Sequence, residues 1–306
     1  MATASGISFV ICTYNRAHYL QDTIQSLLKN EADPNRFELL IIDNNSTDET
    51  PAIAQQFIDG FPNHHIRYVK ESRQGLSFAR NRGIKEAKNK IITFLDDDIS
   101  TDIDFINNWL HFFDTHPNAR CAGGKIEVQF DDPRPDWMSH FLLPLLGHHD
   151  LGDTVKKYKH PKYPFGGNMA FKRSVFDQHG LFDTDLGRKG NELKASEEKE
   201  FFQRLKGVNT DIYYVPKATL YHRVDKQRLT KEYIKRQAIG LGQSISLQLK
   251  DKAMAQKLIK GSSEVFKMIV TLGLFLPYTL TFQLSKAVML IKFRKWIIEG
   301  YLSVTQ

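Results

Sequence analysis

The stretch Lys90–Ile99 joins an apolar run directly to three consecutive carboxylates. Its first half, Ile91–Leu95, is apolar or β-branched throughout, which is typical of a strand buried on both faces of a parallel sheet. Asp96, Asp97 and Asp98 cannot follow that strand into the core, because unpaired buried charge is too costly. They must emerge at the carboxyl end of the strand, the edge at which open α/β sheets bind their ligands.

The three carboxylates have two interpretations when they are considered alone. Aspartate suits an acidic loop or the first turn of a helix, and either would explain their presence. Adjacent carboxylates also repel one another unless a cation lies between them, and hard divalent cations prefer oxygen ligands. The rest of the chain decides between these interpretations.

Three similar strands precede this stretch, and a segment with helical periodicity follows each of them. The strand candidates are Ile7–Cys12, Phe37–Ile42 and Ile66–Val69. Polar segments follow them at Thr13–Arg16, Asp43–Asp48 and Glu71–Gly75. Strand–helix alternation predicts right-handed crossovers and a mostly parallel sheet flanked by helices, so we expect an α/β fold with the polar strand ends along one edge.

A dinucleotide-binding Rossmann domain would also give this alternation. It needs glycines at the first strand–helix turn, so that the backbone can approach a pyrophosphate. Here that turn is Thr13–Arg16 and contains no glycine, and no G-x-x-x-x-G-K-[ST] phosphate loop occurs in the chain. We therefore expect the sheet edge to bind a nucleotide through side chains and a metal ion.

Length and composition are those of a globular protein. With 306 residues and 41% hydrophobic content, the chain can form one large domain or two of ordinary size. Its two cysteines, Cys12 and Cys121, fit neither a disulfide framework nor a zinc cluster. No charged region followed by an apolar run is present near the N-terminus, so we expect no signal peptide and a cytoplasmic protein.

Seven segments, in order over about residues 7–225, carry a family resemblance. They are Val10–Arg16, Ile42–Asp48, Gly75–Asn81, Phe94–Asp98, Phe165–Phe171, Ser196–Phe201 and Tyr221–His222. In this order they resemble the successive blocks of family 2 glycosyltransferases, as found in bacterial surface-polysaccharide synthesis. The resemblance implies the GT-A fold, an inverting reaction, a nucleotide-diphosphate sugar as donor and a divalent metal, Mn²⁺ or Mg²⁺.

The resemblance also implies roles for residues that contact the donor. The substrate-binding positions are Thr13, Asn15, Arg16, Asp43, Asn44, Arg73, Asp96, Asp97, Gly166 and Gly167. The first three form the first nucleotide-contacting turn, and Asp43 with Asn44 the base-contacting one. Asp96 and Asp97 would face hydroxyls of the ribose or the sugar. The two glycines would let the backbone approach the donor sugar.

Catalytic and metal-binding roles carry over in the same way. Glu198 matches the family's base, which accepts the proton of the acceptor hydroxyl, and Glu197 is its acidic neighbour. Both open a helix, where carboxylates also favour the positive end of the dipole. Asp98 and His222 would bind the metal, and neutral imidazole is a suitable manganese ligand. The segment Asp131–Tyr163, rich in Pro, Trp and His, is expected to form a flap over the acceptor site.

The net charge of +7 is unevenly distributed. From Lys226 to Gln306, 14 Lys and Arg stand against 4 Asp and Glu, giving +10, whereas the preceding 225 residues carry −3. This distribution argues against nucleic acid as a partner and for a basic tail that meets an anionic surface. We therefore expect a catalytic domain over residues 1–225 and a basic helical tail over residues 226–306.

Three segments of the tail indicate whether it contacts a membrane or packs on protein. Leu229–Leu249 is predicted to be a helix. Met268–Leu284 is mostly apolar but contains Pro277, and its length of about 17 residues is at the short limit for a spanning helix. Ala287–Ile298 mixes apolar and basic residues, which suits a helix lying in a membrane interface. A helical hairpin packed on the catalytic domain, or on a second subunit of an oligomer, is the alternative.

Together these features predict a metal-dependent inverting glycosyltransferase that is peripheral at the inner face of the cell membrane. It would use a nucleotide-diphosphate sugar, with a UDP-sugar favoured, and extend a glycan or lipid-linked acceptor. A polyprenyl-phosphate sugar transferase is one alternative. A non-catalytic sugar-nucleotide-binding or scaffold protein is another, although the intact carboxylate triplet, Glu198 and His222 argue against it.

Overall fold

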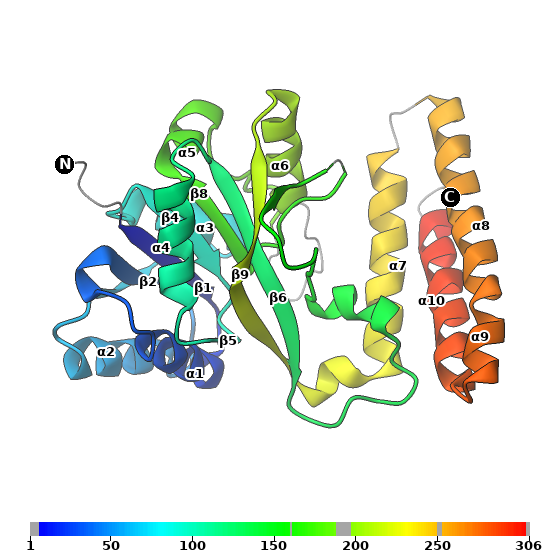
Figure 1. Cartoon of the computed structure of the whole chain (residues 1–306), viewed down its shortest axis with the longest axis horizontal. Coiled ribbons are helices and arrows are strands. Elements are labelled where there is room, and N and C mark those ends of the chain that lie inside the picture. The colour runs from blue at the N-terminus through cyan, green and yellow to red at the C-terminus, as the bar shows by residue number, and fades with distance from the viewer. Residues whose placement is uncertain (1–5, 160, 188–196, 250–252, 304–306) are drawn as a thin grey trace. The chain divides into compact units, whose positions relative to one another are not determined.

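The chain forms two compact units (Figure 1). The structure, a computed structural model, describes residues 6–159, 161–187, 197–249 and 253–303. Unit 1 consists of Met1–Glu127 and His149–Arg223, and unit 2 of Val128–His148 and Val224–Gln306. The expected site residues all belong to unit 1.

One mixed sheet positions the site residues. Its strands have the order β3-β2-β1-β4-β8-β6-β9-β5, and β7 pairs with β9. Their bounds are β1 Ile7–Thr13, β2 Phe37–Asp43, β3 Ile66–Lys70, β4 Ile91–Leu95, β5 Ile99–Thr101, β6 Cys121–Phe130, β7 Lys156–Lys157, β8 Asn168–Lys172 and β9 Ile212–Val224. The four strands expected from the sequence are β1 to β4, and their existence is confirmed.

The sheet is parallel in its first half and antiparallel beyond it. Strand β1 pairs in parallel with β2 and β4, and β2 pairs in parallel with β3. Strand β8 then runs antiparallel to β4 and β6. The polar ends of β1, β2 and β4 therefore lie along one edge, as expected, and the expected α/β class is confirmed.

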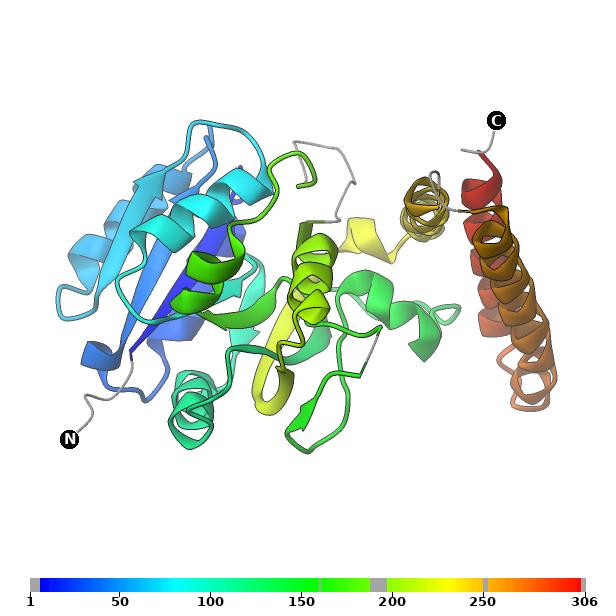
Figure 2. The ribbon, with the colours of Figure 1, turned by 90° about the horizontal axis from the view of Figure 1, so that it is seen from above.

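Two apolar cores cover the two faces of the sheet, because successive strand residues point to opposite sides. Phe9 and Ile11 face one core, with α1 (Ala17–Leu28), α2 (Thr50–Gly60) and α4 (Phe105–Thr115). Val10 faces the other, with α3 (Leu76–Glu86), α5 (Arg173–His179) and α6 (Glu197–Gly207). Figure 2 shows helices on both sides of this sheet. Burial on both faces explains the continuous apolar runs in the sequence.

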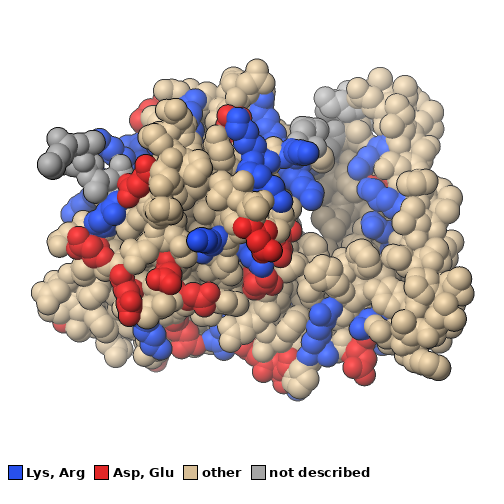
Figure 3. Space-filling model, in the orientation of Figure 1, with Lys and Arg blue, Asp and Glu red and all other residues tan. Residues whose placement is uncertain are grey.

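Unit 2 is helical. Its helices are α7 Lys231–Gln248, α8 Met254–Gly273, α9 Phe275–Leu280 and α10 Leu284–Ser303, and short 3-10 turns span His140–Leu146 and Lys226–Leu229. The core includes Leu142, Ile234, Met289 and Phe293. In the face shown in Figure 3, the part formed by α8 and α9 is largely free of charged side chains.

The packing of α10 differs from the sequence expectation. The sequence favoured an interfacial helix over Ala287–Ile298, but residues of this segment are buried in the core of unit 2. Helix α10 lies so close to α7 that a Cβ atom on Gly242 would be 2.1 Å from the carbonyl oxygen of Ile297. The segment mixes Lys and Arg with apolar residues because its apolar side chains face α7, α8 and α9, whereas Lys292 and Lys295 are exposed. Within unit 2, α10 therefore packs on other helices of the tail, and packing on the catalytic domain or on a second subunit stays a prediction.

Two other segments differ from what the sequence pattern indicated. Strand β9 continues through Pro216 to Val224 and contains His222. A proline has no N–H for a ladder hydrogen bond, so it resembles a strand end. The segment expected to form a flap, Asp131–Tyr163, contains the turn at His140–Leu146 and strand β7, and its role as a flap stays a prediction.

Candidate active site

The carboxylate triplet lies directly after β4, at the edge that the sequence indicated. Asp97 and Asp98 are buried, and Asp96 is half-buried. The backbone carbonyl of Asp98 accepts a hydrogen bond from the N–H of Arg223 at 2.8 Å, which fixes the triplet against β9. Because β5 also pairs with β9 through Ile99 and His222, the imidazole lies beside the triplet.

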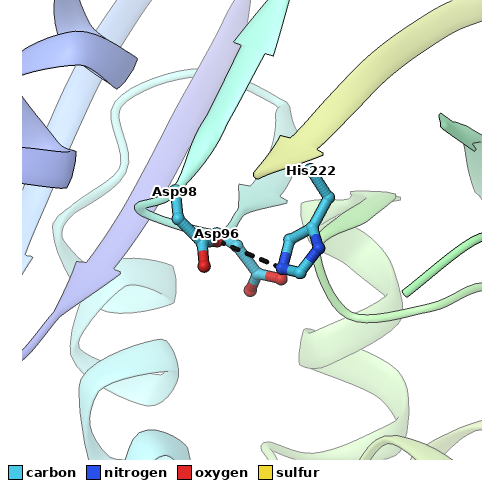
Figure 4. A group of neighbouring side chains, drawn as sticks. All are labelled: Asp96, Asp98 and His222. Carbon is cyan, nitrogen blue, oxygen red and sulfur yellow. Dashed lines mark ion pairs between the residues drawn. The ribbon is translucent and has the colours of Figure 1, made fainter. Parts of the chain in front are cut away.

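Three side chains form a group that fits a metal ion. One ligand atom from each of Asp96, Asp98 and His222 lies within 4.8 Å of the others. Figure 4 shows the His222 ring directed toward both carboxylates, with its Nε2 3.3 Å from Oδ1 of Asp98. Ligands 2.1 to 2.5 Å from one ion lie at most about 4 to 5 Å apart, so the spacing suits a single ion. Two carboxylates and one imidazole are a donor set for a hard or borderline divalent cation such as Mn²⁺ or Mg²⁺.

The group includes one residue more than the sequence assigned. Asp98 and His222 were expected as metal ligands and lie together. Asp96 was expected to face donor hydroxyls, but its carboxylate belongs to the same group.

Arg16 neutralises part of the negative charge of the triplet. Its guanidinium contacts Oδ1 of Asp97 at 2.9 Å and Oδ2 of Asp98 at 2.6 Å. Burial nevertheless raises the pKa of Asp97 to about 7, with Arg16 opposing the shift and Asp98 adding to it. Burial also raises the pKa of Asp96, and the neighbouring charge of Asp98 contributes. Burial and mutual repulsion therefore disfavour the negative charge of these carboxylates, and a cation bound between them would offset that cost.

A second group of charges lies where α3 meets the start of α6. Arg80 donates from one guanidinium nitrogen to Oε1 of Glu197 and from the other to Oε1 of Glu198, each at 2.8 Å. The side chains of Arg80 and Glu197 are 3% and 1% exposed, whereas that of Glu198 is 26% exposed. Both carboxylates are held by one cation, but the exposed fractions identify Glu198 as the one that an external molecule can reach.

The glycine pair connects the two groups. The N–H of Gly166 donates to Oε2 of Glu198 at 2.9 Å, and a Cβ atom there would lie 1.7 Å from Oε1 of the same carboxylate. A Cβ atom on Gly167 would lie 2.4 Å from Oδ2 of Asp96. The pair therefore lets Glu198 and Asp96 approach one backbone segment from two sides, which places the base candidate and the metal group in one site.

The turn expected to contact the nucleotide first follows β1. Asn15 has a left-handed backbone, with φ of 54°. Its side-chain oxygen accepts from the N–H of Thr47 at 2.7 Å, and its own N–H donates to the hydroxyl of Ser46 at 2.9 Å. Thr13 is buried and pairs in register with Asp43 across β1 and β2. These contacts fasten the loops after β1 and β2 to each other.

The second turn is also fastened by its expected contact residues. Asp43 is fully buried and accepts from the hydroxyl of Tyr68 at 2.6 Å. The Asn44 side chain donates to the carbonyl of Arg73 at 2.7 Å and accepts from the N–H of Gly75 at 2.7 Å. The Arg73 side chain is 61% exposed and pairs with Glu71 at 2.8 Å. Asn44 thus closes the loop before α3, and its expected contact with a base stays a prediction.

Arg80 lies in the site although no sequence pattern assigned it a role. Its two partners are 117 and 118 residues further along the chain, so no local pattern connects them. Arg80 lies in the segment Gly75–Asn81, which carries the family resemblance, and this position was the one sequence feature that pointed to it.

Comparisons with known proteins show the family of the chain. Residues 8–180 match the family described as glycosyl transferase family 2. A glucosyl-dolichyl phosphate glucuronosyltransferase of Haloferax volcanii is 23% identical over 233 residues, which are 74% of this chain and 72% of that protein. The succinoglycan biosynthesis protein ExoM of Rhizobium meliloti is 23% identical over 253 residues, which are 81% of this chain and 76% of that protein.

A solved structure has the same fold. It is a mannosyltransferase from Pyrobaculum calidifontis in complex with GDP-mannose and Mn²⁺, similar with a TM-score of 0.64. The sequences are 16% identical, and the match covers 100% of this chain and 89% of the other. The GT-A fold expected from the sequence is therefore confirmed.

Proposed function

The chain belongs to glycosyl transferase family 2, and from this premise we propose that it is an inverting enzyme of polysaccharide biosynthesis. It transfers a sugar from a nucleotide-diphosphate sugar to a hydroxyl of a lipid-linked glycan. The observation that carries the proposal is that the metal-binding group of Asp96, Asp98 and His222 lies beside Glu198 in one site, joined by Gly166–Gly167.

Glu198 is the proposed base. The acceptor oxygen attacks the anomeric carbon while the bond from that carbon to the phosphate oxygen breaks, and the acceptor proton moves to the Glu198 carboxylate. Direct displacement of this kind inverts the anomeric carbon, and a positioned base contributes about 10²- to 10⁴-fold to the rate. The contacts from Arg80 and Gly166 fix the orientation of the carboxylate. Glu197, being buried, anchors Arg80 in this proposal.

Asp98 and His222 are the proposed metal ligands, with Asp96 as a third. When bound, a divalent cation supplies positive charge that offsets the charge of the leaving nucleoside diphosphate. The imidazole nitrogen in the set favours Mn²⁺ over Mg²⁺, because Mg²⁺ prefers oxygen ligands. Asp97 stays with Arg16 and is proposed to orient it toward the donor.

A UDP-sugar is the proposed donor, bound along the loops after β1 and β2. Thr13, Asn15 and Asp43 would position the uridine, and Arg73, whose side chain is mostly exposed, would reach the base or the phosphates. The solved mannosyltransferase holds GDP-mannose, so uridine and guanosine donors have to be compared directly. The name of the Haloferax volcanii relative includes a dolichyl phosphate sugar, which supports a lipid-linked acceptor.

The proposed location is the inner face of the cell membrane. The charge of +10 over Lys226–Gln306 supports contact with anionic lipid, to which each well-placed Lys or Arg adds about 1 kcal/mol. The helix region Met254–Leu280 is long and apolar enough to cross a membrane, and 11% of its apolar window is buried. Packing of this part of the chain against a second subunit is the alternative to membrane contact.

Product analysis tests the proposal. The full chain is offered UDP- and GDP-sugars with a lipid-linked glycan, with and without Mn²⁺, and calorimetry measures nucleotide binding. We expect inverted product and nucleotide binding that chelator or Asp98→Ala removes. Asp104→Ala is the matched control, because Asp104 is exposed and makes no capping hydrogen bond at α4. Tight binding of a nucleotide sugar without turnover on any acceptor would favour the non-catalytic alternative.

A further inference from the structure

Large apolar side chains point outward along α8 and α9. Leu258, Ile259, Phe266, Ile269, Leu276 and Leu280 are each between 60% and 70% exposed. A surface helix of a water-soluble protein normally turns its apolar stripe inward. Scattered single apolar residues at a surface need no explanation, but a face that continues over two helices indicates a partner.

Two polar side chains of α8, Glu264 and Thr271, face the opposite way. Glu264 is 4% exposed and pairs with Lys267 at 2.6 Å and with Lys260 at 3.4 Å. Thr271 is 6% exposed, and its hydroxyl lies 3.4 Å from Nε of Arg294 on α10. The polarity of α8 is therefore inverted, with its carboxylate compensated by two lysines and directed away from the apolar face.

The three threonine hydroxyls of this region are satisfied by their own chain. Thr271 donates to the carbonyl of Lys267 at 2.8 Å, Thr279 to that of Phe275 at 2.7 Å, and Thr281 to that of Pro277 at 2.9 Å. In hydrocarbon, polar groups have to be satisfied internally, because no water is present to bond them. These contacts meet that requirement for the three threonines.

We propose that α8 and α9 enter the hydrocarbon of a lipid bilayer by their outward apolar face. The inference rests on the proposed membrane association. It differs in how the protein binds the membrane, since an apolar face inserts and the basic residues do not bind by adsorption alone. The apolar face is then the anchor, and the basic residues add attraction to anionic lipid.

Charge favours lipid over a second copy of the chain as the occupant. The last 81 residues carry +10. Two such tails brought face to face would repel each other, whereas anionic lipid attracts them. Length agrees with this choice, since the region from Met254 to Leu280 has 27 residues, and helix α8 alone, with 20 residues, extends about 30 Å.

The test uses one substitution for which insertion and adsorption predict opposite signs. Ile269→Lys adds a positive charge to the middle of the apolar face. Insertion predicts that this variant binds vesicles at least about 10-fold more weakly, because a charged side chain in hydrocarbon is costly. Adsorption predicts tighter binding to anionic vesicles. Val208→Lys is the matched control, because Val208 is 55% exposed and lies in unit 1.

Sedimentation of the full chain is measured with neutral phosphatidylcholine vesicles and with vesicles containing phosphatidylglycerol. We expect wild type and Val208→Lys to bind both, and Ile269→Lys to lose both. If wild type binds only the anionic vesicles and Ile269→Lys binds them equally or better, insertion is wrong and the proposed peripheral contact stands. If wild type ignores both, insertion and membrane association are both wrong.

A second copy is detected without vesicles. If light scattering finds a dimer that Ile269→Lys converts to a monomer, the apolar face is a subunit interface and the lipid proposal is overturned. Phe266→Trp keeps the test valid should Ile269→Lys misfold. Its added emission should be quenched by lipids brominated in their acyl chains, and unquenched emission in bound protein would contradict insertion.

Discussion

The backbone N–H of Gly166 donates a hydrogen bond to Oε2 of Glu198 at 2.9 Å, and a Cβ atom on Gly166 would lie 1.7 Å from Oε1 of the same carboxylate. The contact is made between residues 32 apart in the chain. It fixes one oxygen of the proposed base, while Arg80 holds the other at 2.8 Å. Position 166 therefore tolerates no side chain without movement of the carboxylate.

Gly166→Ala should lower turnover by about 10²-fold, as loss of a positioned base does, while the fold is retained. The added methyl group displaces Glu198 and also meets Arg80 at 2.4 Å. Gly207→Ala, at the other end of α6, is the control, because nothing lies within 4 Å of a Cβ atom there. Steady-state rates and thermal melting check both variants. Equal rates for the two would show that the approach of Gly166 to Glu198 is irrelevant to catalysis.

Arg80 should matter for stability far more than its helix neighbour Arg82. Arg80→Ala leaves the buried Glu197 and its neighbour Glu198 without their cation, and loss of one partner of a buried pair costs about 3 to 5 kcal/mol. Arg82 is 41% exposed and pairs with Glu86 four residues on, so Arg82→Ala should cost at most about 1 kcal/mol. Denaturant unfolding measures both free energies. Similar losses for the two variants would contradict the buried-pair description.

The sequence predicted the parallel half of the sheet better than the antiparallel half. Strands β1, β2 and β4 are buried on both faces and appear as continuous apolar runs that need no long-range information. Strand β6 contains Gly123 and Gly124, which resemble a loop in the sequence. In the structure a Cβ atom on Gly124 would lie 2.1 Å from the Asn168 side chain, so the glycine there reflects close packing against a residue 44 positions away.

Site residues were predictable where a strand end presents them, and not where a distant partner defines them. The carboxylate triplet directly follows the buried strand β4, so the local sequence pattern was enough to predict its place at the edge of the sheet. Arg80 belongs to the site because it pairs with Glu197 at the start of α6, which lies more than a hundred residues further along the chain. The role of Asn44 in closing a loop likewise depends on backbone groups of Arg73 and Gly75, which local spacing does not place.

Metal binding should depend on pH. Burial raises the pKa of Asp97 from its ordinary 3.8 to about 7 and also raises the pKa of Asp96. Between these values the folded protein holds protons that the unfolded chain has lost, so the metal-free protein loses stability as pH rises through this window. Deprotonated Asp96 can bind a cation and deprotonated Asp97 adds negative charge beside it, so the affinity for Mn²⁺ should rise as the pH rises.

Thermal melting with and without Mn²⁺, from about pH 5 to about pH 8, measures this dependence. The increase in Tm caused by Mn²⁺ should grow with pH, and Asp97→Asn should reduce the pH dependence of the metal-free protein. An increase in Tm that is the same at both ends of the range would contradict the proposed coupling between protonation and metal binding.

The turnover of Glu198→Gln tests the central claim most directly. The substitution keeps the size of the side chain and removes the proton acceptor, and its amide oxygen can still accept one of the two hydrogen bonds from Gly166 and Arg80. Turnover should therefore fall by about 10²-fold or more while the affinity for the donor and Mn²⁺ is unchanged. Glu197→Gln is measured beside it, because Glu197 is buried and should affect stability more than proton transfer. Near-normal turnover of Glu198→Gln, with donor affinity intact, would contradict the assignment of Glu198 as the base of an inverting transfer.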